Sequence, residues 1–403
     1  MAETRIVLQL CETIDPGDIA TYVKRDGFQA LTKARAMGPE AVIAEIKASG
    51  LKGRGGAGFP CGAKWELARS TPGDEKFVIC NADEGEVGTF KDRYIIQHDP
   101  FSLIEGIGIA AHAIGARKAY IYLRGEYHYL LDGLKGAIDQ ATSKGLLGLT
   151  IEIREGAGAY ICGEESALMN SIEGKRGEAR FRPPFPPESG LFGSPTIINN
   201  VETLMNIPRI IAKGAAWFSR IGTAKSTGTK AFSVSGDVER PGVYELAMGS
   251  RLAELLELAG AKDVKLVQIG GATGGIVPAS MINTPLSYET VLGSGAVTVM
   301  NVSRDVIDFV YRSMEFLNEE SCGECTPCRE GTEVMVDILD RLTRGEGAEE
   351  DIKVLEELSR VMMDSSLCGL GQAAPIPVLD TLKYFRNDYE NRIKQSVFLR
   401  TLR

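Results

Sequence analysis

The sequence predicts three folded units in succession: an α/β layered unit, a small α+β unit and a helical bundle. Between residues 51 and about 225, strand-like runs rich in β-branched residues alternate with helix-like runs, which is typical of a layered α/β fold. A hairpin pattern, one helix and two further strand-like runs follow, up to about residue 300. From Arg304 onward the pattern is almost wholly helical.

The domain boundaries follow from these changes of pattern. We expect an N-terminal helical segment over residues 1–50, an α/β domain over 51–227, an α+β domain over 228–302 and a helical-bundle domain over 303–403. The first segment contains the amphipathic runs ALTKARAM and PEAVIAEIKASG, which predict two or three short helices.

The α/β domain has three predicted strands. The runs FVICNA, KAYIYL and LTIEIR predict strands at residues 77–82, 118–123 and 149–154. Helices are predicted between these strands at residues 102–115 and 129–145. Strands joined by helices in this way indicate a Rossmann-like layered fold.

The α+β domain and the helical bundle have similarly clear patterns. AFSVSG and GVYEL flank the turn DVERPG and predict a hairpin, and the helix SRLAELLELAG and the strands VKLVQIGG and AVTVMNV follow. This order indicates a unit of ubiquitin-like, or β-grasp, proportions. In the bundle, one helical stripe is formed by Met335, Ile338, Leu339 and Leu342.

Composition excludes several classes of protein. With 44% apolar and 25% charged residues, the 403-residue chain has the make-up of a globular protein. No run approaches the ~18 consecutive apolar residues of a membrane span, so we expect no direct membrane insertion. The net charge of −9 argues against nonspecific nucleic-acid binding. The N-terminal run MAETRIVLQLCETIDP lacks a signal-peptide pattern, and we expect a cytoplasmic protein.

Four cysteines form the most informative motif. Cys322, Cys325 and Cys328 lie close together in SCGECTPCRE, and Cys368 follows in SSLCGLGQ. Three thiolates as close together as the first three can bind one face of an iron–sulfur cluster, and a thiolate from a distant segment can supply the remaining ligand. Structural zinc, which prefers two separated pairs of ligands, is the main alternative, and disulfides or free thiols are a further one. The pattern indicates a chain that moves electrons.

A glycine-rich run, GRGGAGFPCGAKW at residues 53–65, is the first candidate ligand site. It contains G-x-G-x-x-G, but a Rossmann fingerprint must follow a strand, and the preceding AVIAEIKASGLK predicts a helix. Its backbone N–H groups could still hold a pyrophosphate or a flat ring, with Lys64 beside a phosphate and Phe59 stacked on a purine. The alternative is a flexible surface loop.

Four further segments could line the same site. CNADEGEVGTFKDR (80–93) follows a strand, where a carboxylate can accept hydrogen bonds from ribose hydroxyls. GAGAYICGEESALMNSIEG (156–174) precedes a helix starting near Ser166, whose N-terminus suits a phosphate or a ring edge. INNVETL (198–204) offers two amides, and the proline-rich RFRPPFPPESGLFG (180–193) could form one wall of a cleft. The structural alternatives are an acidic surface loop, a helix cap and a linker.

The chain resembles a known family in six motifs that occur in the same order: GRGGAGFPxGxKW, CNADExE, GAGAYICGEE, PPFP, INNVET and SCGxCTPCREG. The family comprises the NADH-binding flavoprotein subunit of respiratory complex I and the matching subunits of NAD-linked hydrogenases and formate dehydrogenases. The resemblance runs from about Asp15 to about Tyr389. It implies FMN in the α/β domain, NAD(H) stacked above it and a 4Fe–4S cluster in the helical bundle. The segment SLCGLGQAAPIPV is most similar to the hydrogenase and formate dehydrogenase branch.

The resemblance also implies roles for individual residues. The cluster ligands would be Cys322, Cys325, Cys328 and Cys368, and Glu165 would tune the reaction at the flavin. The implied cofactor-binding positions are Gly53, Arg54, Gly55, Gly56, Ala57, Gly58, Phe59, Lys64, Asn81, Asp83, Glu84, Glu86, Tyr160, Gly163, Glu164, Glu165, Phe185, Asn199, Asn200 and Thr203. Glu86 matches the ribose-binding acid of the family, and Phe59 and Phe185 match aromatics around the adenine. A second stacking aromatic of some relatives is replaced here by Leu67.

The activity implied is hydride transfer between NADH and FMN, then one-electron transfer to the 4Fe–4S cluster and on to partner-subunit clusters. We expect the NADH dehydrogenase module of an NADH-linked hydrogenase, with electron bifurcation left open. A formate dehydrogenase or complex I subunit is the alternative within the family, and a non-enzymatic iron–sulfur or zinc scaffold is the alternative outside it. The implied partners are a thioredoxin-like 2Fe–2S subunit and an Fe–S-rich catalytic subunit of hydrogenase or formate dehydrogenase type. The chain has no second CxxCxxCxxxC run, so we expect electrons to leave to another polypeptide.

Overall fold

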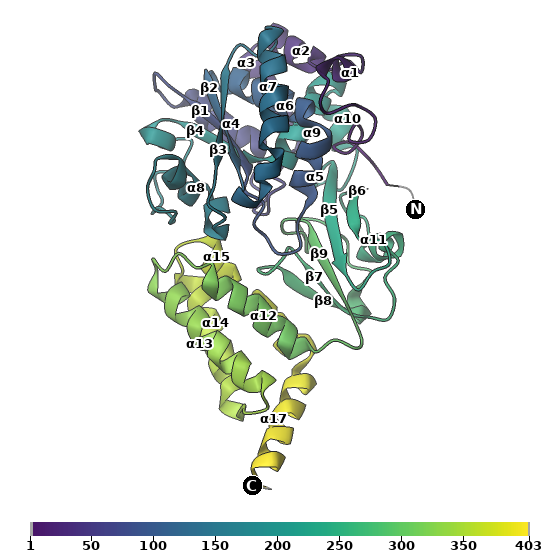
Figure 1. Ribbon diagram of the computed structural model, residues 1–403, viewed down its shortest axis with the longest axis vertical. Coiled ribbons are helices and arrows are strands. Elements are labelled where there is room, and N and C mark those ends of the chain that lie inside the picture. The colour runs from purple at the N-terminus through teal and green to yellow at the C-terminus, as the bar shows by residue number, and fades with distance from the viewer. Residues whose placement is uncertain (1–2, 402–403) are drawn as a thin grey trace.

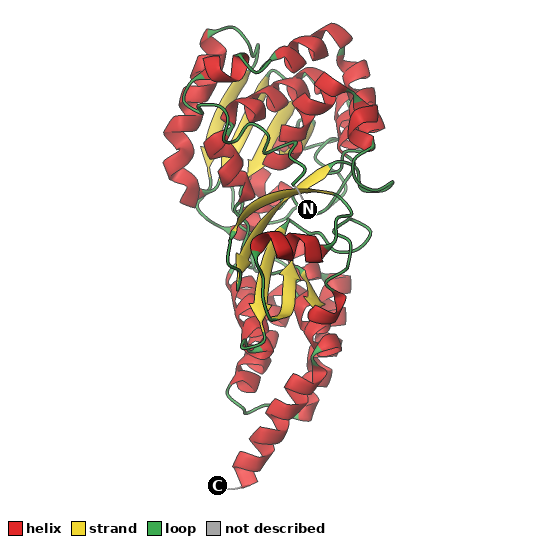
Figure 2. Ribbon diagram, turned by 90° about the vertical axis from the view of Figure 1, so that its right-hand side faces the viewer, coloured by secondary structure: helices red, strands yellow, loops and turns green. Residues whose placement is uncertain are grey.

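The computed structural model describes residues 3–401, with side chains described up to Lys394. The molecule is elongated, with the α/β unit at one end, the C-terminal helices at the other and the α+β unit beside their junction (Figure 1). The view turned by 90° shows the α+β sheet between the two end units (Figure 2). The outermost residues of the first and last expected domains, 1–2 and 402–403, lie outside the described part.

A parallel sheet with the strand order β3-β2-β1-β4 forms the centre of the α/β unit. Two of its strands coincide with the runs expected at residues 77–82 and 118–123, and the third is displaced by one residue. The chain runs outward from β1 to β2 and β3 and then returns to the other side of β1 with β4. This reversal opens a crevice at the carboxyl ends of β1 and β4, which is where open α/β sheets bind ligands. The strands are β1 (Phe77–Ala82), β2 (Lys118–Leu123), β3 (Thr150–Glu155) and β4 (Thr196–Asn200).

Helices cover both faces of this sheet. Val78 and Cys80 of β1 face a core that also contains the N-terminal helices, while Phe77 and Ile79 face a core shared with α8 and the C-terminal helices. The helices expected at residues 102–115 and 129–145 are present as α6 and α7. The helices of this unit are α1 (Ile19–Val23), α2 (Gln29–Met37), α3 (Pro39–Ser49), α4 (Cys61–Ser70), α5 (Lys91–His98), α6 (Pro100–Ile114), α7 (Leu131–Ser143), α8 (Glu165–Ile172), α9 (Val201–Lys213) and α10 (Ala215–Ser219), with short 3₁₀ turns η1 (Gly125–Leu130), η2 (Tyr160–Gly163) and η3 (Leu191–Gly193).

The α+β unit is a five-stranded sheet of order β6-β5-β9-β7-β8 with one packed helix. The expected hairpin is formed by β5 and β6, which pair antiparallel, and β5 pairs parallel with β9 in the centre, as in a β-grasp fold. The short strand β8 was not expected, because its four residues lie between a glycine cluster and a 3₁₀ turn. The elements are β5 (Thr229–Gly236), β6 (Gly242–Ala247), α11 (Leu252–Ala259), β7 (Val264–Ile269), β8 (Gly275–Pro278), η4 (Ala279–Met281) and β9 (Ala296–Asn301).

The C-terminal helices pack around the stripe expected from the sequence, since Met335, Ile338, Leu339 and Leu342 are all buried. Three of the four motif cysteines lie in the turn before α13 and in the first turn of that helix, and the fourth directly precedes α15. None of the described helices is both long and apolar enough to cross a membrane. The helices are α12 (Val306–Glu319), α13 (Thr326–Thr343), α14 (Glu349–Ser365), α15 (Gly369–Ala373), α16 (Ile376–Tyr384) and α17 (Arg386–Thr401).

Candidate functional site

Two adjoining cavities open where β1 and β4 end. One, of about 480 Å³, is lined by the acidic run after β1 (Asp83, Glu84 and Glu86), and we call it the carboxylate cavity. The other, of about 720 Å³, is lined by Phe59 and Phe185, and we call it the aromatic cavity. Both are bordered by the same stretches of chain, so they form one continuous cleft. The residues common to the two are Gly55, Gly56, Ala57, Asn81, Gly163, Glu164, Asn200 and Gly369.

The cleft brings together nearly all positions implied by the resemblance. The exception is Arg54, whose side chain is fully buried and donates hydrogen bonds to the carbonyl oxygens of Thr227 and Thr229. Arg54 therefore points away from the cleft, and only its backbone belongs to the glycine loop. The implied positions that line the cleft are Gly53, Gly55, Gly56, Ala57, Gly58, Phe59, Lys64, Asn81, Asp83, Glu84, Glu86, Tyr160, Gly163, Glu164, Glu165, Phe185, Asn199, Asn200 and Thr203.

The glycine loop over residues 53–58 follows helix α3 rather than a strand, as its sequence context predicts. Its shape depends on glycine at two places. A Cβ at Gly55 would lie 3.0 Å from the Cβ of Asn200, and Gly58 has φ +66° with the Tyr288 ring 2.6 Å from where its Cβ would be. Gly56, with φ +140°, lines both cavities of the cleft, and a Cβ there would lie 4.0 Å from the backbone nitrogen of Ser294. The loop therefore presents bare backbone to whatever occupies the cleft.

Two asparagines, Asn81 and Asn199, lie near the carboxyl ends of β1 and β4, and their side-chain amides form hydrogen bonds within the protein. Asn81 donates to the carbonyl of Gly163 at 2.8 Å and accepts from the N–H of Asp83 at 3.1 Å. Asn199 accepts from the indole N–H of Trp65 at 2.9 Å. Because these amides cannot rotate without losing bonds, their remaining donor and acceptor sites point in fixed directions.

The acidic run after β1 places its carboxylates in different environments. Glu84 is buried and accepts hydrogen bonds from the N–H groups of Asp92 and Arg93 at the start of α5, so it has a structural partner. Asp83 is different, because its Oδ2 is buried without a hydrogen-bond partner among the described residues. Burial raises the pKa of Asp83 to about 7, against the opposing charge of Arg124. An unpartnered oxygen at the cleft wall is available to a bound ligand.

The mouth of the aromatic cavity carries a set of paired charges. Glu164 caps helix α8 by accepting from the N–H groups of Ser166 and Ala167, both at 2.9 Å. Glu165 lies between two cations, with Lys64 Nζ 3.1 Å and Arg182 Nη1 3.1 Å from its carboxylate oxygens. Arg182, from the proline-rich loop, also pairs with Glu164. This loop is thus tied across the cleft to the start of α8.

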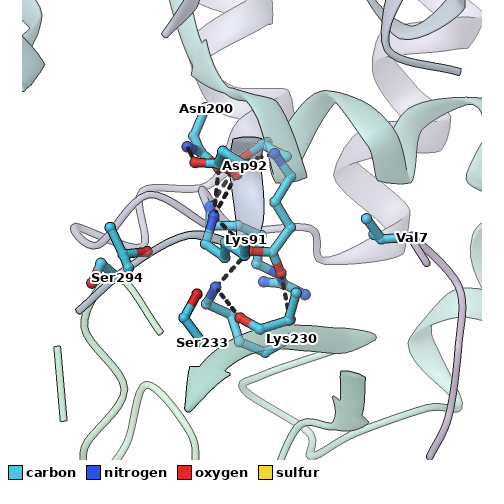
Figure 3. Close-up of polar contacts among 12 residues, drawn as sticks. Val7, Lys91, Asp92, Asn200, Lys230, Ser233 and Ser294 are labelled. Atoms are coloured by element: carbon cyan, nitrogen blue, oxygen red, sulfur yellow. Dashed lines mark hydrogen bonds and ion pairs between the residues drawn. The ribbon is translucent and has the colours of Figure 1, made fainter. Parts of the chain in front are cut away.

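A buried charge network borders the carboxylate cavity, with Lys91, Asp92 and Asn200 in its wall, and Figure 3 shows the polar contacts of the network. Lys91 Nζ lies 2.7 Å from Asp92 Oδ1 and 3.0 Å from Glu202 Oε2, and Lys230 of β5 contacts the same Glu202 carboxylate. Burial lowers the pKa of Lys230 to about 7 despite the attraction of Glu202. Asn200 joins the network by donating to Asp92 Oδ2 at 2.6 Å. The network fastens the α+β unit to the cleft floor.

Sequence reasoning missed several of these wall residues. Lys91 and Asp92 line the cavity and belong to the segment at residues 80–93, but they are not among the individual positions implied by the resemblance. The β-grasp unit contributes Gly270, Thr273 and Ser294, which no motif had indicated. A signal for the first two was present as the glycine cluster GGATGG at residues 270–275.

The four motif cysteines line one small pocket beside the cleft. Cys328 and Cys368 are buried, and Cys322 and Cys325 are half-buried. Burial, with smaller effects from the three other thiols, raises the pKa of Cys328 to about 11, against a hydrogen bond from Ser321. Four thiols facing one pocket are the donor set that an iron–sulfur cluster uses.

The sequence arrangement of these cysteines favours a cluster over a single zinc ion. Structural zinc prefers two separated pairs of ligands, whereas here three cysteines lie around the start of α13 and one precedes α15. Within residues 3–394, no group of three or more His, Cys, Asp or Glu side chains is placed to hold a single metal ion.

The cleft and the cysteine pocket share a wall. Ile161, from η2, and Leu370, from α15, line both the carboxylate cavity and the cysteine pocket. Gly369, next to Cys368, lines both cavities of the cleft. A group in the cleft would therefore be separated from a group in the pocket by about one layer of side chains.

Comparisons with known proteins agree with this geometry. Residues 46–209 match the model of the Nuo51 FMN-binding domain family, residues 232–276 match the SLBB domain family, and residues 308–392 match the NADH-ubiquinone oxidoreductase-F iron-sulfur binding region. The three matches correspond to the α/β unit with the cleft, the α+β unit and the cysteine-bearing helices.

The chain is also similar to known proteins over most of its length, in sequence and in structure. The chain is 43% identical to the NADP-reducing hydrogenase subunit HndC of Solidesulfovibrio fructosivorans, covering 97% of this chain and 84% of that one. It is 43% identical to the mitochondrial NADH dehydrogenase (ubiquinone) flavoprotein 1 of Dictyostelium discoideum, covering 89% of this chain and 80% of that one. A chain in the crystal structure of an H₂-reduced NAD⁺-reducing [NiFe]-hydrogenase superposes with a TM-score of 0.90 at 39% identity, covering 97% of this chain and 66% of that chain.

Proposed function

The chain belongs to the family of NADH-oxidoreductase flavoprotein subunits that bind FMN and a 4Fe–4S cluster, and from that premise we propose how its cleft and cysteine pocket divide the work. The cleft holds FMN and NAD(H), and Cys322, Cys325, Cys328 and Cys368 hold the cluster. The observation that carries the proposal is the shared wall of Ile161 and Leu370, because electrons tunnel efficiently only over short distances.

The residues of the cleft fit a flavin. The bare backbone over residues 53–58 suits a flat ring or a phosphate, and Asn81, Asn199 and Asn200 offer hydrogen-bonding groups in fixed directions. The unpartnered Oδ2 of Asp83 supplies one more such group. When bound, FMN exchanges a hydride with NAD(H) and exchanges electrons singly with an iron–sulfur cluster. Arg54 contributes by anchoring the loop rather than by touching the cofactor.

The aromatic cavity suits the adenine end of the nucleotide. Phe59 and Phe185 are exposed there, 56% and 47%, so their ring faces are free for stacking. Glu86 and Tyr160 lie in the carboxylate cavity and suit ribose hydroxyls. Glu165, held between Lys64 and Arg182, tunes the charge beside the reacting rings and takes no part as nucleophile or general base.

The cysteine pocket fits the cluster through its four convergent thiols. Burial raises the pKa of the Cys328 thiol, and Cys328 would hold the cluster as a thiolate, so cluster binding would release its proton. The half-buried Cys322 and Cys325 mark the side nearest to solvent. We infer that electrons pass on that side to a partner subunit.

We further propose that the chain serves a hydrogenase-type complex. The support is the similarity to the subunit of an NADP-reducing hydrogenase and to a chain of an NAD⁺-reducing hydrogenase. The partners would be a thioredoxin-like 2Fe–2S subunit and an Fe–S-rich catalytic subunit. In this proposal the domain over residues 51–227 carries the flavin, residues 228–302 form the β-grasp domain and the domain over residues 303–403 carries the cluster, while the described residues of the N-terminal segment pack on the flavin domain.

Reduction of the bound flavin by NADH tests the proposal. Protein prepared anaerobically should show flavin absorbance that bleaches on addition of NADH without any partner. A non-enzymatic scaffold would show no flavin and no response to NADH. Identifying the subunits that co-purify with the chain would distinguish a hydrogenase from a formate dehydrogenase or a complex I arm.

A further inference from the structure

We propose that the β-grasp loop over residues 270–274 is part of the nucleotide site, and that Thr273 is a positioning residue that fixes the carboxylate of Glu86. This inference rests on the proposed function of the cleft. It gives the β-grasp domain a direct part in substrate binding, beyond connecting the flavin and cluster domains.

The contacts around Glu86 come from two directions. The Ala272 N–H donates to Glu86 Oε1 at 2.7 Å, and the Thr273 hydroxyl donates to Glu86 Oε2 at 3.1 Å. From the 3₁₀ turn η2, the Tyr160 hydroxyl donates to the same Oε2 at 2.7 Å. Tyr160 is itself fixed, because its N–H donates to Glu320 Oε2 at 2.9 Å and its ring packs edge-on against Phe316. The carboxylate is therefore clamped between the β-grasp loop and a tyrosine anchored to the cluster domain.

The loop can reach Glu86 only because it is built of glycine. Gly271 has φ +81°, and a Cβ there would lie 2.1 Å from the Cγ of Glu86. Gly270 has φ +103°, and its Cβ would lie 3.2 Å from the Cα of Gly293 in the neighbouring loop. A side chain at Gly271 would push the loop off the carboxylate, and one at Gly270 would press on the neighbouring loop. The contact with Glu86 thus explains the glycine at position 271.

The clamp leaves the carboxylate with little spare capacity. A carboxylate accepts about four hydrogen bonds, two on each oxygen. Oε2 accepts from Tyr160 and Thr273, Oε1 accepts from Ala272, and the Val87 N–H is a further donor to the carboxylate. The carboxylate is therefore held in a fixed direction before a ribose hydroxyl reaches it, so little freedom is lost when the nucleotide binds.

Thr273 also acts on the charge of Glu86. Burial raises the pKa of Glu86, and the hydrogen bonds from Tyr160, Ala272 and Thr273 lower it again in part. Tyr160 is the titratable group that faces Glu86 across these bonds, since the loop over residues 270–274 carries only glycine, alanine and threonine. Removing the Thr273 hydroxyl would therefore raise the pKa of Glu86 and protonate it at higher pH.

The test uses the full chain loaded with flavin and cluster, and compares Thr273→Val with Thr273→Ser and Thr284→Val. Thr284 is a matched control in the same domain, because its hydroxyl donates to the carbonyl of Met281 and it lines neither cavity of the cleft. NAD⁺ and NADH affinities are measured by calorimetry across a pH series, with steady-state KM and kcat for NADH alongside.

Thr273→Val should weaken NADH binding roughly tenfold, as expected for a lost hydrogen bond to a charged group, with the loss falling on KM more than on kcat. The acid limb of its affinity profile should move to higher pH. Thr273→Ser should restore both, and Thr284→Val should match the wild type. Equal affinities and pH profiles for Thr273→Val and Thr284→Val would overturn the inference, as would a loss confined to kcat. Failure of the loaded wild-type protein to bind NADH would instead overturn the proposed function itself, and this inference with it.

Discussion

The cleft and the cysteine pocket meet their ligands in different ways. In the cleft, most polar side chains already have partners: Asn200 donates to Asp92, and Glu86 is held by Tyr160 and Thr273. In the pocket, the thiols contact backbone N–H groups and a hydroxyl: the Leu367 N–H donates to Cys325 Sγ at 3.5 Å, and the Ser321 hydroxyl lies 3.3 Å from Cys328 Sγ. Hydrogen bonds between protein groups thus order the cleft, while in our proposal the cluster joins the four cysteines of the pocket.

This difference suits the lifetimes of the two kinds of ligand. A nucleotide that enters and leaves at every turnover binds best to a site that does not reorganise. A cluster that stays bound can instead supply the interactions that hold its own site together. The shared wall of Ile161 and Leu370 then keeps the two sites close while their chemistry stays separate.

The largest expected effect is the loss of the cluster from the cysteine pocket with the flavin retained in the cleft. Cys368→Ser should lose most of the iron and labile sulfide, because a hydroxyl is a poor substitute for the fourth thiolate, while flavin content stays near normal. Iron and sulfide analysis, EPR and flavin absorbance measure the three quantities. Cys11→Ser is the control, since Cys11 is also buried but lies in the other core. A native iron content and EPR signal in Cys368→Ser would refute the cluster assignment.

The next effect concerns the one cleft carboxyl without a partner among the described residues. The pKa of Asp83 is raised to about 7, so the folded protein keeps a proton that the unfolded chain releases above pH 3.8. The stabilising contribution of this proton is complete below about pH 4 and is lost as the pH rises through about 7. In flavin-free protein, Asp83→Asn should therefore be more stable than the wild type by roughly 4 kcal/mol at pH 8, with little difference near pH 4.

Urea denaturation over a pH series measures this gap in the free energy of unfolding. Asp139→Asn serves as the control, because Asp139 is exposed on α7. If the free energies of unfolding of Asp83→Asn and the wild type change with pH in the same way, the pKa of Asp83 is not raised in the folded protein.

A smaller effect tests the charge set at the mouth of the cleft. Glu165→Gln removes the negative charge between Lys64 and Arg182, and it should lower kcat/KM for NADH about fivefold while flavin remains bound. Stopped-flow reduction of the flavin by NADH gives both the affinity and the rate. Glu257→Gln, on the exposed face of α11, should behave like the wild type. Unchanged kinetics in Glu165→Gln would remove Glu165 from the site.

The smallest effect sharpens the role of the aromatic cavity. Leu67 lines this cavity with Phe59 and Phe185 and is 41% exposed. Leu67→Phe should lower the KM for NADH about threefold by adding a stacking face for the adenine, whereas Leu67→Met should not. If the two substitutions have equal effects, adenine does not stack at this position.

The sequence predicts those elements of the fold that have a strong local pattern. The runs at residues 77–82 and 118–123 became β1 and β2 because continuous β-branched and aromatic stretches favour buried parallel strands. Strand β4 was missed because its last residues, Asn199 and Asn200, read as helix caps, and Asn200 indeed caps α9 as well. Local signals cannot show that one segment serves both purposes.

The residues of the candidate site that belong to family motifs could be predicted from the sequence. The residues that reach the site only through the packing of distant elements could not. Thr273 lies 187 residues from Glu86, and only the docking of the β-grasp unit brings them together. Lys91 and Asp92 lie close to the acidic run in sequence, but their burial against Glu202 depends on α9 and β5. Arg54 shows the converse, because its place in a glycine motif suggests a ligand contact while its side chain serves packing.

The central claim is that the cleft and the cysteine pocket form one electron path from NADH to a cluster. Anaerobic titration of the isolated protein with NADH, followed together by flavin absorbance and EPR, tests it most directly. We expect bleaching of the flavin and the appearance of a reduced-cluster signal without any added partner. Protein that stays colourless and inert toward NADH after reconstitution with flavin, iron and sulfide would contradict it.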